Sequence, residues 1–260
     1  MIASEPHESE VGQLLQIIRD TWRHLLTKPG LVIISAFLGI VVWGPKGNPI
    51  FSAWLLPRLG GLPLSDGWIR QLLSYGSGLV LLVAVPFLLI RFRFKERLSD
   101  YGLGRGDMRL GLVFTATLIV TCVVPFTFAS NDKSMWQEYP LLYQGLSVEQ
   151  MRAQFQWSSF VAYELVYASF FFIIEFIFRG YLLFGLRERF GQYAVLVQML
   201  SYTAWHLPKP ITELVGTPIW GFAVAAVTLR LGSLWYVFLA HWLLNVFMDT
   251  LILAHQGVLG

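Results

Sequence analysis

The sequence FFFIIEFIFRGYLL at residues 170–183 combines the composition of a membrane helix with two ionisable side chains. Glu175 and Arg179 are four residues apart, so they lie one helical turn apart on the same face. An ionisable group placed in hydrocarbon costs about 2.5–3.5 kcal/mol on insertion scales. Such groups are retained either because they hold helices together or because they take part in a reaction. The other polar groups in apolar stretches help to decide between these two roles.

The composition of the whole chain is that of an integral membrane protein. Of 260 residues, 55% are hydrophobic and only 13% are charged, against about 25% charged residues in soluble domains. We therefore predict an all-α, polytopic transmembrane helical bundle with the lipid bilayer as its partner. The net charge of +3 does not indicate a nucleic-acid partner, because membrane proteins use Lys and Arg for orientation. The sequence contains no Gly-rich phosphate loop, so nothing in it points to a nucleotide ligand. Cys122 is the single cysteine, which excludes an intramolecular disulfide.

The N-terminal segment, residues 1–30, is expected to be amphipathic. Between residues 11 and 27 one helical face carries apolar side chains and the other carries Arg19, Asp20 and Arg23. This pattern predicts an interfacial helix on the membrane or an amphipathic helix packed on the bundle. Residues 1–10 lack the basic and apolar regions of a signal peptide, so we expect the first membrane segment to be retained.

Hydropathy predicts about seven spans. They cover residues 31–43, 72–92, 110–129, 157–186, 192–206, 216–229 and 232–254. The first apolar run has 13 residues, or about 20 Å of helix against a hydrocarbon core of about 30 Å, so it either spans or is re-entrant. Four prolines predict a loop over residues 44–72. Ser147 and Gln150 form a capping-box pattern that opens a helix running into the fourth span.

The distribution of Lys and Arg predicts the orientation of the bundle. With seven spans, one side carries Arg19, Arg23, Lys28, Arg91, Arg93, Lys95, Arg97, Arg105, Arg109, Arg179, Arg187, Arg189 and Arg230. The other side carries Lys46, Arg58, Arg70, Lys133, Arg152 and Lys209. The N-terminus is therefore expected in the cytoplasm. The lack of eukaryotic targeting signals favours a prokaryotic inner (plasma) membrane.

Three predicted helices place polar side chains at a common depth. At 1.5 Å per residue, Glu175 lies about 18 Å from the inner end of its span, His206 about 21 Å and His241 about 14 Å. All three positions fall in the middle third of a hydrocarbon core about 30 Å thick. Further polar groups in or beside these helices are Glu164, Glu213, Asn245 and Asp249.

Each group has a structural interpretation when it is taken alone. Glu175 and Arg179 fit an ordinary helix-stabilising ion pair, and His241 with Asn245 fits hydrogen bonding between membrane helices. Because these groups lie at one depth, a catalytic role is favoured over a structural one. A carboxylate and an imidazole can hold and deprotonate water, and a second His with an amide can donate hydrogen bonds to a developing oxyanion.

Such a set of groups can hydrolyse an amide inside a membrane. The same Glu175, His206 and His241 could instead form a three-ligand zinc site with an open position, and the sequence leaves both mechanisms open. No cofactor is favoured, and zinc is the one considered. The chain contains no His-Glu-x-x-His and no Gly-x-Ser-x-Gly motif.

Three motifs in chain order resemble those of the CAAX protease and bacteriocin-processing (CPBP, or Abi) family of intramembrane proteases. They are Glu175-x-x-Phe178-Arg179-Gly180, Tyr202-x-x-x-His206 and His241-x-x-x-Asn245. The resemblance covers residues 157–254, which we interpret as the catalytic core behind N-terminal helices and loops at 31–156. It implies an endopeptidase acting on a membrane-anchored protein or peptide substrate, as relatives act on prenylated CAAX termini. The resemblance also implies roles for the matching residues, with the His of the second motif partnering a general base and His241 and Asn245 forming the oxyanion site.

The chain departs from the usual first motif, Glu-Glu-x-x-x-Arg, because Ile174 occupies the position of the first Glu. Glu175 then becomes our candidate for the general base, with Arg179 in support. Alternatively Glu213, which is the favoured substitute, Glu164 or Asp249 supplies the carboxylate. A second hypothesis is a catalytically silent member that acts as a bacteriocin-immunity or membrane-protein-binding protein. A third, a proton-coupled transporter, receives little support because no long-range internal repeat is visible.

Overall fold

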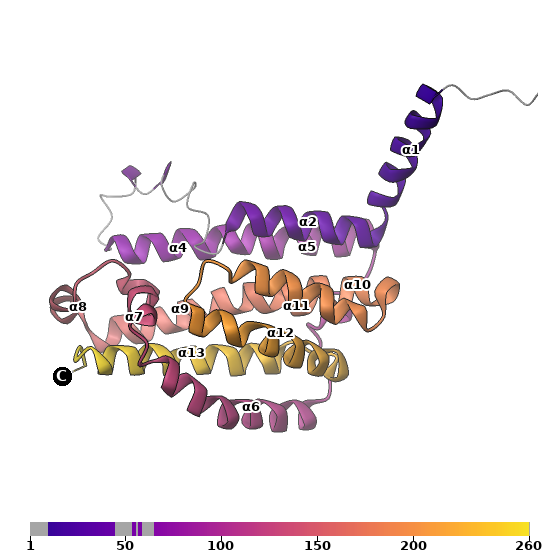
Figure 1. The fold of residues 1–260 in the computed structure, drawn as a ribbon. Helices are drawn as coiled ribbons and strands as arrows, with labels where there is room; N and C mark the ends of the chain where they lie inside the picture. The colour runs from indigo at the N-terminus through magenta and orange to yellow at the C-terminus, as the bar shows by residue number, and fades with distance from the viewer. Residues whose placement is uncertain (1–9, 45–53, 56, 59–64, 260) are drawn as a thin grey trace, which may run out of the picture.

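The computed structural model describes residues 10–44, 54–55, 57–58 and 65–259, and within these ranges it contains helices and no strand. The helices form one bundle with α1 projecting from it (Figure 1). The chain is thus an all-helical integral membrane protein. The loop predicted for residues 45–53, 56 and 59–64 lies outside the described residues, as does Lys46.

Two short helices at the N-terminal end meet at a sharp bend. Helix α1 covers Glu10–Leu25 and α2 covers Lys28–Trp43, and their axes are bent by 80°. No residue of α1 is buried. Because α1 projects from the bundle, its placement on a membrane surface stays a prediction. Helix α2 runs beside α4 and α5, and it buries Val32, Ala36, Gly39 and Trp43.

The second membrane segment begins earlier than predicted. A continuous helical stretch covers Asp66–Phe94 and consists of α4 (Asp66–Gly78), the π-helix η1 (Leu79–Ala84), α5 (Val85–Leu88) and the π-helix η2 (Leu89–Phe94). The predicted loop is therefore wrong for residues 66–72. The reason is a cap, because the Ser65 side chain accepts a hydrogen bond from the Trp68 N–H and starts the helix there.

The middle of the chain contains one long helix followed by short ones. After the 3₁₀ turn η3 (Leu98–Tyr101), α6 covers Met108–Ala129 and matches the predicted third span. Helix α7 (Lys133–Glu138), the turn η4 (Leu141–Tyr143) and α8 (Val148–Gln154) follow. The capping box at Ser147 is confirmed, but its helix does not run into the next span. Phe155 and Gln156 have extended backbones and separate α8 from α9.

The C-terminal half supplies the centre of the bundle. Trp157–Phe190 is one 34-residue stretch made of α9 (Trp157–Glu175), the π-helix η5 (Phe176–Leu182) and α10 (Leu183–Phe190). Every residue of η5 is buried. Helix α11 covers Tyr193–Trp205, α12 covers Ile211–Leu231 and α13 covers Trp235–His255.

The predicted count of seven spans is not reached. In the described part of the chain five helices are long and apolar enough to cross a membrane, or six if α1 and α2 form one bent span. The shortfall lies in α2 and α11, which have 16 and 13 residues. These lengths give only about 24 Å and 20 Å of helix, less than a hydrocarbon core of about 30 Å.

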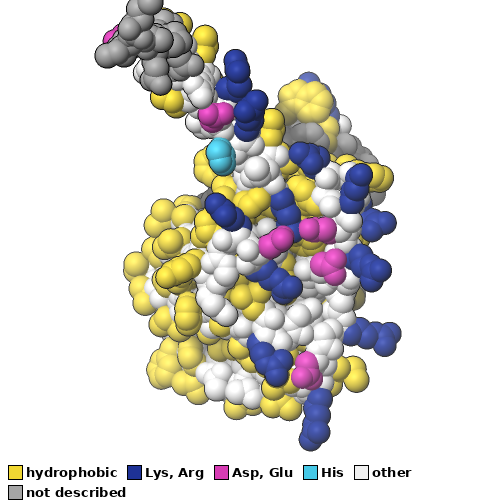
Figure 2. Space-filling model, turned by 90° about the vertical axis from the view of Figure 1, so that its right-hand side faces the viewer, with side chains coloured by type: hydrophobic (Ala, Val, Ile, Leu, Met, Phe, Trp, Pro, Cys, Tyr) yellow, Lys and Arg dark blue, Asp and Glu magenta, His cyan; other side chains and the backbone are white. Residues whose placement is uncertain are grey.

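Lys and Arg side chains gather at one end of the bundle. The segment after η2, the start of α6, the end of α10 and the end of α12 all meet at the right-hand end of Figure 1. Figure 2 views this end and shows many Lys and Arg side chains with a few carboxylates among them. The predicted charge asymmetry is therefore present in the fold, and its assignment to the cytoplasmic side stays a prediction.

Candidate active site

Glu175 and Arg179 lie at the centre of the bundle, where α9 passes into η5. Both side chains are fully buried, and Arg179 Nη1 is 3.4 Å from Glu175 Oε1. The ion pair expected from their spacing is therefore formed. The π-helical turn that carries Arg179 was not expected from the sequence, and such turns occur preferentially at functional sites because they change the register of side chains along a helix.

Glu175 contacts the histidine of α13. His241 Nδ1 lies 2.7 Å from Glu175 Oε1, so the imidazole donates from Nδ1 to the carboxylate. The rings of Phe171 and Trp220 pack against His241 at centroid distances of 4.8 and 5.1 Å. Held in this way, His241 has Nε2 available for another contact.

His206 occupies the end of α11 and is held through its other ring nitrogen. Its Nδ1 lies 2.8 Å from the carbonyl oxygen of Tyr202. A carbonyl oxygen only accepts hydrogen bonds, so Nδ1 carries the proton and Nε2 of the neutral ring is the basic nitrogen. That nitrogen lies 3.5 Å from Glu213 Oε1. The structure thus pairs His206 with Glu213 and His241 with Glu175.

Glu213 is oriented by a chain of hydrogen bonds in which each donor is defined. Tyr139 Oη donates to Glu213 Oε2 at 2.9 Å. Lys209 Nζ donates to Tyr139 Oη at 3.1 Å and to Glu138 Oε1 at 2.7 Å. Because an ammonium group can only donate, it directs the phenolic proton of Tyr139 toward Glu213. Oε2 of Glu213 is therefore engaged, and Oε1 faces His206.

The two carboxylate–imidazole pairs belong to one site. His206 is close enough to His241 and Arg179 to interact electrostatically with both. Tyr202 connects the pairs, since the guanidinium of Arg179 lies 3.9 Å from its ring centroid and its ring packs on His206 at 4.3 Å. Tyr202 therefore joins the second motif to the first through a cation–π contact with Arg179.

Asn245 lies one turn after His241 on α13. Its Nδ2 donates to the backbone oxygen of His241 at 2.9 Å. This bond uses one of the two amide protons, and the second remains available to an oxyanion on the same face.

Glu164 and Asp249 form a separate pair. Both are buried, on α9 and α13, and their carboxyl groups contact each other. Glu164 precedes Glu175 by 11 residues, about 16 Å along the helix. The structure therefore does not bring these two carboxyls to His206 or His241.

No three His, Cys, Asp or Glu side chains in the described part of the chain are arranged to hold a metal ion. Glu175 and His241 contact each other, whereas His206 faces Glu213. The three residues considered for zinc are thus divided between two pairs.

Three members of the network were not predicted from the sequence. Glu138 ends α7 and Tyr139 follows it, far from the motifs, and Lys209 lies between two prolines after His206. Only the distances of the folded chain reveal that they reach Glu213.

Comparison with known proteins gives one match. Residues 152–247 match the family model described as "Type II CAAX prenyl endopeptidase Rce1-like". The matched region contains Glu175, His206, Glu213, His241 and Asn245, and it confirms the family resemblance drawn from the three motifs. No curated protein and no solved structure matches the chain.

Proposed function

We propose that this chain, whose residues 152–247 match the type II CAAX prenyl endopeptidase family model, hydrolyses a peptide bond in a membrane-anchored substrate. The proposed substrate class follows the description of the matching family model, a CAAX prenyl endopeptidase. The scissile bond would reach the centre of the bundle, where the polar side chains of α9, η5, α11, α12 and α13 converge.

The observation that carries the proposal is the 3.5 Å approach of Glu213 Oε1 to His206 Nε2. The usual first-motif Glu is replaced by Ile174, whose side chain is packed in the apolar core. Glu213 supplies a carboxylate to the motif histidine from another helix. We therefore assign the water-activating role to Glu213 with His206, and not to Glu175.

In the proposed reaction, a water molecule donates hydrogen bonds to Glu213 Oε1 and His206 Nε2. One of these groups takes a proton as the water oxygen bonds to the scissile carbonyl carbon, and the carbonyl oxygen becomes an oxyanion. The proton then moves to the amide nitrogen, the C–N bond breaks, and an amine and a carboxylic acid leave. Water is consumed, and the chain returns to its starting protonation state.

Glu175, Arg179, His241 and Asn245 have a different role in this scheme. The Glu175 carboxylate at 2.7 Å stabilises a protonated His241, whose Nε2–H can then donate to the oxyanion. Asn245 contributes its second amide proton. Arg179 keeps Glu175 in place, so Glu175 acts as a positioning residue for His241.

The test uses the purified chain in lipid nanodiscs and a quenched fluorescent peptide with a prenylated CAAX terminus. His206→Ala and His241→Ala are compared with His255→Ala, a matched control because His255 lies at the far end of α13 and contacts the Ser130 carbonyl. We expect cleavage by the wild type and His255→Ala, and loss by about 10²-fold or more in the other two. Full cleavage by His206→Ala and His241→Ala would refute the site.

A non-catalytic role is the competing candidate, and Ile174 is the observation that favours it. That side chain is 1% exposed and offers no carboxylate where relatives carry one. A silent protein predicts no cleavage of any lipid-anchored peptide by the wild type. It also predicts that His206→Ala retains partner binding.

A further inference from the structure

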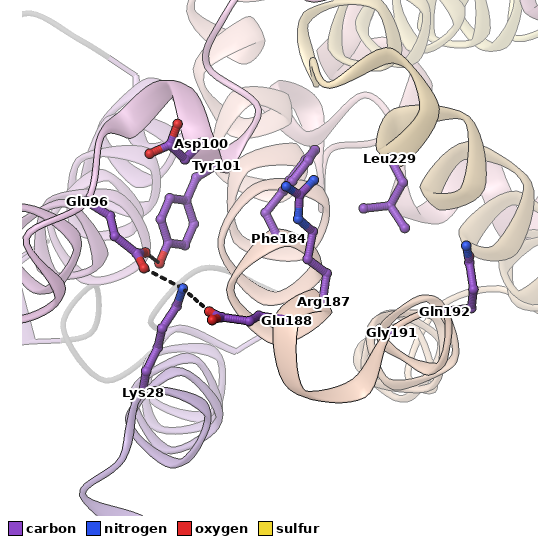
Figure 3. A pocket seen from close by; sticks show the side chains of 10 residues that line it. All are labelled: Lys28, Glu96, Asp100, Tyr101, Phe184, Arg187, Glu188, Gly191, Gln192 and Leu229. Carbon is purple, nitrogen blue, oxygen red and sulfur yellow. Dashed lines mark hydrogen bonds and ion pairs between the residues drawn. The ribbon is translucent and has the colours of Figure 1, made fainter.

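A polar hollow lies at the basic end of the bundle, away from the proposed catalytic centre. Its volume is about 620 Å³, and α2, η3, α10 and the ends of α11 and α12 border it. Figure 3 shows the side chains that surround it. Its lining includes Lys28, Asp100, Phe184, Arg187, Glu188 and Gln192.

One side of the hollow carries carboxylates. Lys28 Nζ donates to Glu96 Oε1 at 2.6 Å and lies 3.4 Å from Glu188 Oε2 (Figure 3). Tyr101 Oη donates to the other oxygen of Glu96 at 2.5 Å. Two carboxylates thus face one ammonium group, and the Glu188 side chain is 80% exposed, so a second cation can reach it.

The other side of the hollow is cationic. Among the described residues no carboxylate pairs with Arg187, whose guanidinium lies 5.4 Å from the Phe184 ring centroid. Gln192 directly precedes the 13-residue α11 and its side chain makes no capping hydrogen bond there, at the end of the helix where the dipole is positive. A guanidinium, an amide and a helix start on one side can hold an anion, and Arg is the preferred residue for a phosphate.

The two sides together fit a zwitterion whose phosphate and ammonium groups are a few ångströms apart. Helix ends at the charged end of a membrane bundle lie where phospholipid headgroups lie. A carboxylate binds a primary ammonium group favourably because the ammonium group donates hydrogen bonds to its oxygens. A quaternary ammonium group would need an aromatic cage, and Tyr101 and Phe184 are the only rings among the ten lining residues.

We propose that this hollow binds the headgroup of a phospholipid that carries a phosphodiester and a primary amine, the phosphatidylethanolamine class. Arg187 and Gln192 contact the phosphate, and Glu188 contacts the ammonium group. Phe184 and Leu229 contact the glycerol carbons. The site is independent of peptide hydrolysis.

The experiment measures lipid retention by native mass spectrometry and thermal unfolding of the full chain in detergent with added lipid. The lipids are phosphatidylethanolamine, phosphatidylcholine and phosphatidylglycerol, each added at the same mole fraction. We expect phosphatidylethanolamine to bind about tenfold more tightly than the other two, the equivalent of one charge-assisted hydrogen bond. Equal binding of the three lipids would overturn the proposal.

Two variants test the assigned contacts. Arg187→Gln should weaken phosphatidylethanolamine binding about tenfold, whereas Arg189→Gln, an exposed neighbour outside the hollow, should not. Glu188→Gln should reduce the preference over phosphatidylglycerol without abolishing phospholipid binding, a change that misfolding cannot produce. Unchanged selectivity in both Arg187→Gln and Glu188→Gln would refute the site.

A competition measurement distinguishes binding of a lipid from binding of a soluble compound with the same headgroup. Glycerophosphoethanolamine, which has the headgroup without acyl chains, is added to the same protein. We expect it to compete only at concentrations far above those of the lipid. Equally tight binding of the free compound would overturn the lipid assignment.

Discussion

His206 Nε2 and Glu213 Oε1 lie 3.5 Å apart, although the two residues belong to different helices and are separated by two prolines. The opposite ring nitrogen of His206 is fixed by the Tyr202 carbonyl, and the opposite oxygen of Glu213 is fixed by Tyr139. Each partner thus presents a single atom to the other.

Replacing Glu213 by Gln should lower kcat by about 10²–10⁴-fold, because the amide cannot take a proton from water. Cleavage of the lipid-anchored peptide in nanodiscs measures this. Glu164→Gln is the matched control, since that carboxyl is also buried but pairs with Asp249. Equal losses in the two variants would show that burial, and not the contact with His206, matters.

Tyr139→Phe should lower kcat by about tenfold and leave KM nearly unchanged. The change removes one hydrogen bond to a charged group, worth about 1.5–3 kcal/mol, without altering the volume near Glu213. Tyr143→Phe is the control, because the Tyr143 hydroxyl has no hydrogen-bond partner in the described residues. A Tyr139→Phe enzyme with wild-type kcat would remove Tyr139 from the proposed network.

Glu175→Gln should destabilise the fold by about 3–5 kcal/mol, because it leaves the buried Arg179 without its carboxylate. Adding Arg179→Met to that variant should recover part of the loss. Unfolding in detergent measures both effects, with the exposed Glu149→Gln as control. Strictly additive losses in the double variant would mean that the two side chains do not stabilise each other.

Cleavage should survive chelation. The proposed scheme uses a carboxylate and two imidazoles that are divided between two pairs, so a chelator in excess is expected to leave kcat within about twofold, well below the loss of a catalytic group. Elemental analysis of the purified protein accompanies the assay. Activity lost on chelation and restored by zinc would replace the water-activation scheme with a metal mechanism.

The sequence predicted which helices carry the motif residues better than it predicted the membrane topology. Motif spacing identified the helices that carry Glu175, His206 and His241, and these helices do converge. Hydropathy predicted more spans than the helices of the described residues provide, because an apolar run predicts burial whether or not its helix is long enough to cross. Helix α11 shows this, since it is apolar but ends after 13 residues.

By itself the sequence determined the helical class, the resemblance to the CAAX protease family, the ion pair of Glu175 with Arg179 and the gathering of Lys and Arg at one end. These features follow from local spacing, which fixes helical faces and helix ends. The tertiary structure alone decided which carboxylate meets which histidine, because that depends on how α11, α12 and α13 pack around η5. In the folded chain Glu213 lies beside His206, and Ile174 packs in the apolar core. Tyr139 and Lys209, which lie outside the motifs, contact each other beside Glu213.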